Sequence, residues 1–81
     1  MSGIVKFLGS EVTLSGTGNT VASSVVTRLV NKGASAHVVT LAGNTFTVLP
    51  GSELTVKKGT ADTLSVDSGS DVVAAPVAFT N

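Results

Sequence analysis

β-Branched residues dominate this chain and limit its fold more than any other sequence feature. The 81 residues include 14 valines and 11 threonines, but only seven leucines and three phenylalanines. A doubly substituted Cβ loses χ1 freedom in a helix and packs well on a pleated sheet, so this composition favours strands. Nine glycines and two prolines divide the chain into segments of strand length. The sequence therefore predicts an all-β fold.

Between these breaks the chain contains eight segments with strand character. They lie at Ile4–Leu8, Glu11–Leu14, Ser24–Asn31, Ala36–Ala42, Thr45–Leu49, Glu53–Lys57, Thr63–Val66 and Val72–Phe79. Short strands separated by turn residues are typical of a small antiparallel β-sandwich or a partly closed barrel, here of about seven to eight strands. A chain of this length forms one domain, over residues 1–81.

Apolar and polar residues alternate over residues 45–49 and 53–57, which is the pattern of a half-buried antiparallel sheet. The residues expected to face inward are Phe46, Val48, Leu54 and Val56. Between the two segments, Pro50 and Gly51 stand in the order that positions i+1 and i+2 of a type II turn require. We therefore predict a tight connection over residues 49–52.

Residues 21–32 allow two interpretations. Apolar residues recur every four positions from Val21 to Leu29, and Gly33 follows where a helix would end, which fits a helix. The segment contains no Glu, Gln or Met, however, and residues 23–27 are poor in helix formers. We favour a strand with an irregular start and keep the helix as the alternative.

A chain this short gains only marginal stability from its own core, because it buries roughly 60% of the surface that its unfolded form exposes. The absence of cysteine excludes disulfides and thiolate metal sites. Charged residues make up 12% of the chain and the net charge is zero, which suits packing among copies and disfavours nucleic acid. No stretch approaches the roughly 20 apolar residues of a membrane span, and the N-terminus has no basic run followed by an apolar block, so we expect neither a span nor a signal peptide. We expect a homo-oligomer made in the cytoplasm, without a nucleic-acid or membrane partner.

The two ends of the chain are the predicted contact surfaces. Residues 72–81 are mostly apolar, and Pro76 is expected to keep this segment out of a central strand position. We predict extended arms over residues 72–81 and 1–7 that add strands to neighbouring chains. The predicted interface residues are Ile4, Phe7, Val72, Val73, Pro76, Val77 and Phe79.

The sequence offers little that points to catalysis or to a cofactor. His37 is the only imidazole, and its apolar neighbours indicate a hydrogen-bonded or partly exposed strand residue. No Gly-x-Ser-x-Gly motif is present, and the glycines at 16 and 18 lack the third glycine of a dinucleotide-binding loop. Residues 67–71 resemble the start of a calcium loop without its final Glu. We predict no enzyme activity, no cofactor and no metal site.

Several runs of this sequence resemble small β-rich virion structural proteins of tailed bacteriophages. The runs are Val25–Asn31, Ala34–Thr40, Leu49–Glu53, and Lys57-Lys58 before Ala61–Leu64. The likeness covers roughly residues 11 to 66. It implies a capsid decoration (cement) protein or a minor tail or neck component.

From this resemblance we predict a non-enzymatic virion structural protein on the capsid surface, which binds the major capsid protein or another virion protein and reinforces the phage head lattice. A small homo-oligomer such as a trimer is expected. The alternative is a minor tail, neck or fibre-associated protein. Two other classes have less support: a carbohydrate-binding sandwich would need exposed Trp or Tyr, which the sequence lacks, and a small enzyme would need His37 in a pocket.

Overall fold

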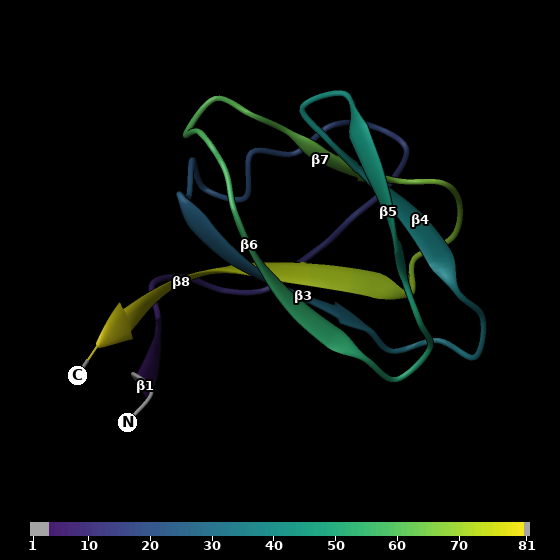
Figure 1. Ribbon diagram of the computed structural model, residues 1–81, viewed down its shortest axis with the longest axis horizontal. Helices are drawn as coiled ribbons and strands as arrows, with labels where there is room; N and C mark the ends of the chain where they lie inside the picture. Colours follow the sequence, from purple (N-terminus) through teal and green to yellow (C-terminus); the bar gives the residue numbers. More distant parts are fainter. Residues whose placement is uncertain (1–3, 81) are drawn as a thin grey trace.

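The computed structural model describes the backbone of residues 4–80 and the side chains of residues 6–78 (Figure 1). The described residues form eight strands and no helix, which confirms the predicted all-β fold. Each strand overlaps one of the predicted segments. The strands are β1 (Ile4–Phe7), β2 (Val12–Thr13), β3 (Val26–Asn31), β4 (His37–Leu41), β5 (Asn44–Val48), β6 (Glu53–Lys57), β7 (Leu64–Val66) and β8 (Val72–Thr80).

The strands of residues 4–80 form two antiparallel sheets in a sandwich-like arrangement. The large sheet has the order β1-β8-β3-β6, with β2 also beside β8, and the small sheet has the order β5-β4-β7. Apolar side chains from both sheets and from the β2–β3 connection meet in one core. Its buried members are Leu14, Val21, Leu29, Val39, Val48, Leu64, Val66, Val72 and Ala74.

One side of the sandwich is closed by the chain between β2 and β3. The amide of Leu14 donates to Val72 O in the large sheet, and Ser15 O then accepts from the amide of Val66 in the small sheet. Asn19 continues beside β7 and exchanges two backbone hydrogen bonds with Leu64. The chain thus changes sheets at residues 14–15.

β8 is the central strand of the large sheet, so the prediction of a free arm or edge strand over residues 72–81 is wrong for the described part, Val72–Thr80. β8 pairs with β3 on one side and with β1 and β2 on the other. Pro76 was expected to keep this segment out of a central position in the sheet. It is tolerated because the register places it opposite Thr27, at a position where its own backbone groups point away from β3.

The direction of these groups follows from one hydrogen bond. The amide of Leu8 donates to Pro76 O, on the β1 side, at 2.8 Å. The N–H and C=O of a residue in an antiparallel strand point the same way, so the N–H that proline lacks would also point there. That side faces Leu8 and the break between β1 and β2, where the register shifts, so the hydrogen bonds between β8 and β3 are kept.

The two predicted arms are paired with each other. β1 pairs with the C-terminal part of β8, from Phe7 opposite Val77 to Ile4 opposite Thr80. β3 reaches along β8 only as far as Val77. Figure 1 shows β1 and the end of β8 together at one end of the molecule, away from β4, β5 and β7. We call this pair, β1 with residues 78–80, the terminal ribbon.

The predicted turn at residues 49–52 is present and joins the two sheets. The amide of Ser52 donates to Leu49 O at 3.1 Å, and Gly51 has a φ of +75°, as position i+2 of a type II turn requires. β5 before the turn pairs with β4, whereas β6 after it pairs with β3. Of the side chains predicted to face inward here, Leu54 is the exception, because it is 40% exposed at the edge of the large sheet.

The favoured interpretation of residues 21–32 is confirmed, because an irregular turn leads into β3. Val21, Ala22 and Ser23 all have left-handed backbones, with φ values of 52°, 57° and 56°. The Asn19 side chain accepts a hydrogen bond from the amide of Val21 at 2.7 Å. Val21 is thereby held in the core although a β-branched residue rarely adopts this conformation.

Candidate functional site

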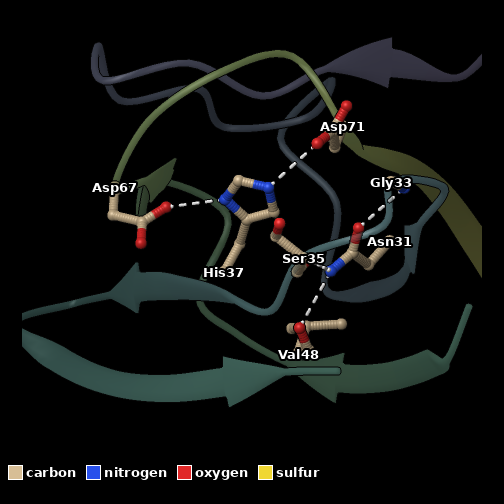
Figure 2. Close-up of polar contacts among 7 residues, drawn as sticks. All are labelled: Asn31, Gly33, Ser35, His37, Val48, Asp67 and Asp71. Atoms are coloured by element: carbon tan, nitrogen blue, oxygen red, sulfur yellow. Dashed lines mark hydrogen bonds and ion pairs between the residues drawn. The ribbon is translucent and has the colours of Figure 1, made fainter. Parts of the chain in front are cut away.

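Seven residues form a polar cluster at one end of the sandwich, which we call the His37 cluster (Figure 2). They come from the end of β3, the β3–β4 loop, the start of β4, the end of β5 and the β7–β8 loop. The cluster consists of Asn31, Gly33, Ser35, His37, Val48, Asp67 and Asp71. It joins segments that lie far apart in the sequence.

Asn31 is the buried half of the cluster. Its Nδ2 donates to Ser35 O at 2.8 Å and to Val48 O at 2.9 Å, and its Oδ1 accepts from the amide of Gly33 at 2.9 Å. The side chain is fully buried, so each of these bonds replaces one that water would otherwise make. Asn31 therefore fixes the β3–β4 loop against β5.

His37 is the second half, and it lies between two carboxylates. Its Nδ1 lies 2.9 Å from Asp67 Oδ1, and its Nε2 lies 3.1 Å from Asp71 Oδ2. A neutral imidazole has one N–H, so it satisfies one carboxylate and turns a lone pair toward the other. The protonated ring donates to both, and this geometry therefore selects the imidazolium form.

The carboxylates shift the protonation equilibria in the direction this geometry requires. The hydrogen bond to Asp67, and then that to Asp71, raise the pKa of His37 above its ordinary value of 6.5, although desolvation opposes them. The hydrogen bond from His37 in turn lowers the pKa of Asp67, with help from the backbone of Val38. The ion pairs hold the β7–β8 loop against the start of β4.

The arrangement is suited to holding loops together rather than to catalysis. Both ring nitrogens of His37 are occupied by carboxylates, so neither is free to take a proton from a serine. The predicted hydrogen-bonded strand histidine is confirmed. Over residues 4–80, we find no pocket and no group of three or more acidic or imidazole side chains arranged to bind a metal. The acidic loop considered as a calcium site directs Asp67 and Asp71 to His37 instead.

A second polar feature, which the sequence did not indicate, is the buried side chain of Lys58 just after β6. Its ammonium donates to Gly59 O at 3.1 Å and to Asp62 O at 3.0 Å. Burial lowers the pKa of Lys58, with a smaller opposing effect from the charge of Asp62. Lys58 closes the turn between β6 and β7, and nothing in its sequence context distinguishes it from the exposed Lys57.

The predicted interface residues fall into three groups. Val72, Val73, Pro76 and Val77 are buried within β8, so their side chains are not available for a partner in this conformation, contrary to the prediction of a free arm. Phe7 is 52% exposed, and its ring lies 5.6 Å from Arg28 Cζ. The side chains of Ile4 and Phe79 lie outside the described residues.

The face of the large sheet that points away from the small sheet is apolar along its centre, and we call it the outer face. Cross-strand register places Phe7, Val77 and Val26 in one row across it. Val73, Ala75 and Val77 are buried, yet they are not part of the core cluster between the sheets. Arg28 lies on this face, opposite Ala75, and pairs with Glu53 at 2.7 Å.

Phe7 is the last residue of β1 in the terminal ribbon, and Leu8, which follows it, is 58% exposed. Single exposed apolar residues are common on soluble proteins, but two large ones in succession at the end of β1 suggest a contact there. Phe7 was among the predicted interface residues but Leu8 was not, because the predicted N-terminal arm ended at residue 7.

Comparisons of the chain with protein-family models, with curated proteins and with solved structures give no match. Among the described residues, no helix has the length and apolar character needed to cross a membrane.

Proposed function

We propose that this chain is a non-enzymatic structural protein of a phage particle, specifically a capsid decoration (cement) protein that binds the major capsid protein on the head surface and reinforces the lattice. The proposal takes its partner class from the sequence resemblance. The structural observation that supports a binding role is the exposure of two successive large apolar side chains, Phe7 and Leu8, at the base of the terminal ribbon.

Three further features fit a binding role. The described residues contain no pocket, so a macromolecular surface is a better candidate ligand than a small molecule. The few charges leave little electrostatic repulsion between neighbouring copies. The terminal ribbon extends from the rest of the molecule, so it is in a position to reach a neighbouring subunit (Figure 1).

The test is the copy number of this protein in purified particles, measured by quantitative mass spectrometry relative to the major shell protein. A decoration protein is present in several hundred copies, in proportion to the shell lattice. A dozen copies or fewer would place the protein in the tail or neck and overturn the decoration role. Absence from the particle would overturn both virion roles.

The contact surface is tested separately with the Phe7→Ser and Leu8→Ser variants. If the base of the ribbon binds the shell, the double variant decorates undecorated shells at clearly reduced occupancy. Leu49→Ser is the matched control, because Leu49 is at least as exposed, at 61%, but lies in the turn between β5 and β6. Equal occupancy for the two variants would show that Phe7 and Leu8 do not form the contact.

A further inference from the structure

β6 forms an open edge of the large sheet. Within residues 4–80 it pairs with β3 alone, and its five residues read Glu53-Leu54-Thr55-Val56-Lys57. Four of the five side chains are exposed, including Leu54 at 40%. An edge strand of this kind presents unpaired backbone groups to any strand that approaches it.

Two hydrogen bonds show which backbone groups of β6 are available. The amide of Lys58 donates to Val25 O at 2.7 Å, and the amide of Asn31 donates to Ser52 O at 3.0 Å. Backbone groups in a strand alternate in direction, so those of even-numbered residues from 52 to 58 point to β3. The N–H and C=O groups of Glu53, Thr55 and Lys57 therefore point out from the free edge.

The charges of β6 are arranged so that the strand complements itself. We propose that β6 is a self-association strand, which pairs antiparallel with β6 of a second copy about a twofold axis at Thr55. In this register Glu53 stands opposite Lys57 of the second copy, and Lys57 stands opposite its Glu53. Thr55 stands opposite Thr55. All three outward-pointing residues become hydrogen-bonded pairs, and the two large sheets join into one.

The side chains fit the same register. Glu53, Thr55 and Lys57 share one face, and Glu53 accepts a hydrogen bond from Arg28 Nε through Oε2, which leaves Oε1 to face Lys57 of the second copy. On the opposite face, the half-exposed Leu54 meets Val56 of the second copy. Opposite charges and apolar side chains in directly opposed positions both stabilise a strand pair.

The other edges lack this complementarity. β5, the edge of the small sheet, has no charged residue between Asn44 and Val48. β7 is covered by the chain at residues 15–19. β1 carries Lys6 without an acidic residue to oppose it.

A lysine at a sheet edge ordinarily discourages pairing, but an antiparallel second copy of β6 places an acidic residue opposite Lys57. The pairing depends on β6 alone and is independent of the function proposed above.

Sedimentation equilibrium of the purified protein over a concentration series tests the proposal. We expect a monomer–dimer equilibrium with a Kd on the order of micromolar, because a five-residue strand contact is small. Lys57→Glu and Glu53→Lys should each weaken the dimer about tenfold or more, because each places two like charges opposite one another. A monomer at all concentrations, or an oligomer that neither substitution weakens, would overturn the proposal.

Mixing the two variants gives the sharper result. A Lys57→Glu chain opposite a Glu53→Lys chain has two complementary contacts, so native mass spectrometry should detect heterodimers in large excess over either homodimer. A purely destabilising effect of the substitutions would give no such rescue. Random mixing of the two variants would contradict the register.

A backbone variant separates pairing from folding. Thr55→Pro removes an N–H that points to the free edge and is not bonded to β3, so the fold should keep its thermal stability while the dimer is lost. A folded Thr55→Pro protein that dimerises as tightly as the parent would show that the β6 edge is not the interface.

Discussion

The Nε2 atom of His37 lies 3.1 Å from the Oδ2 atom of Asp71, so the first residue of β4 is joined to the residue that precedes β8. Asp67 holds the other side of the same ring. The central strand of the large sheet and the central strand of the small sheet are thus connected through one side chain at the end of the sandwich (Figure 2).

This connection predicts a stability that depends on pH. The pKa of His37 is raised in the folded protein, so its contribution is complete below 6.5 and is lost as the pH rises through the folded-state pKa. The pKa of Asp67 is lowered from 3.8, so its contribution is present above 3.8 and is lost as the pH falls through the folded-state value. Urea unfolding at several pH values should give a maximum between these limits.

The single histidine makes the alkaline side of this profile easy to assign. His37→Gln should flatten the pH dependence of the free energy of unfolding between about pH 6 and pH 9, the range in which a histidine with a raised pKa loses its proton. The NMR signals of the ring should also titrate above 6.5 in the parent. A ring that titrates at or below that value would contradict the two-carboxylate geometry.

Asn31→Ala should be among the most destabilising single substitutions in the chain. It removes both donors to Ser35 O and Val48 O in a buried setting, which we expect to lower the free energy of unfolding by about 2–4 kcal/mol. Urea denaturation measures the change. Asn44→Ala is the matched control, because Asn44 is exposed, and it should change stability by no more than about 0.5 kcal/mol. Equal effects would contradict the role of Asn31.

Gly33 is required by the close approach of Asp71. A Cβ at position 33 would overlap the Asp71 carboxylate. Gly33→Ala must therefore displace Asp71, one of the two carboxylates that bind the His37 ring. We expect a loss of about 1–3 kcal/mol and a lower pKa of His37. Gly16→Ala is the control, because nothing lies within 4 Å of a Cβ there. An unchanged His37 titration in Gly33→Ala would show that Asp71 accommodates the methyl group without leaving the ring.

Ala22→Gly should stabilise the protein. Ala22 is exposed and has a φ of 57°, a conformation that costs an L-residue about 1 kcal/mol and glycine nothing. A rise in the thermal midpoint would confirm this strain. Ala61→Gly, at an exposed turn position that is not left-handed, should instead lower stability, since it only adds freedom to the unfolded chain. We expect the thermal midpoint to rise in Ala22→Gly and to fall in Ala61→Gly.

Much of the fold was predictable because its causes are local. Strand segments follow from β-branched residues, and their limits follow from glycine and proline within a few positions. The turn at Pro50-Gly51 is a property of two adjacent residues and is formed as predicted. The irregular start of β3 was predicted from weak helix propensity, but the left-handed backbone of Val21 was not, because the core around it determines that conformation.

The role of Pro76 could not be predicted from its neighbours. A proline is excluded from a central strand only where its missing N–H would face a partner, and here that direction faces the break between β1 and β2. Whether such a break exists depends on how three strands from the two ends of the chain pair. The buried position of residues 72–77 followed from that pairing and not from their composition.

The sequence by itself determined that this chain forms short antiparallel strands, approximately where each strand lies, and that no thiolate chemistry is possible. Only the tertiary structure decided that β8 is central, that the two ends of the chain pair with each other, that Asp67 and Asp71 enclose His37, and that β6 is left at an open edge. The physical reason is that strand propensity acts within a few residues, whereas pairing partners are chosen by burial and hydrogen bonding between segments as far apart as β1 and β8.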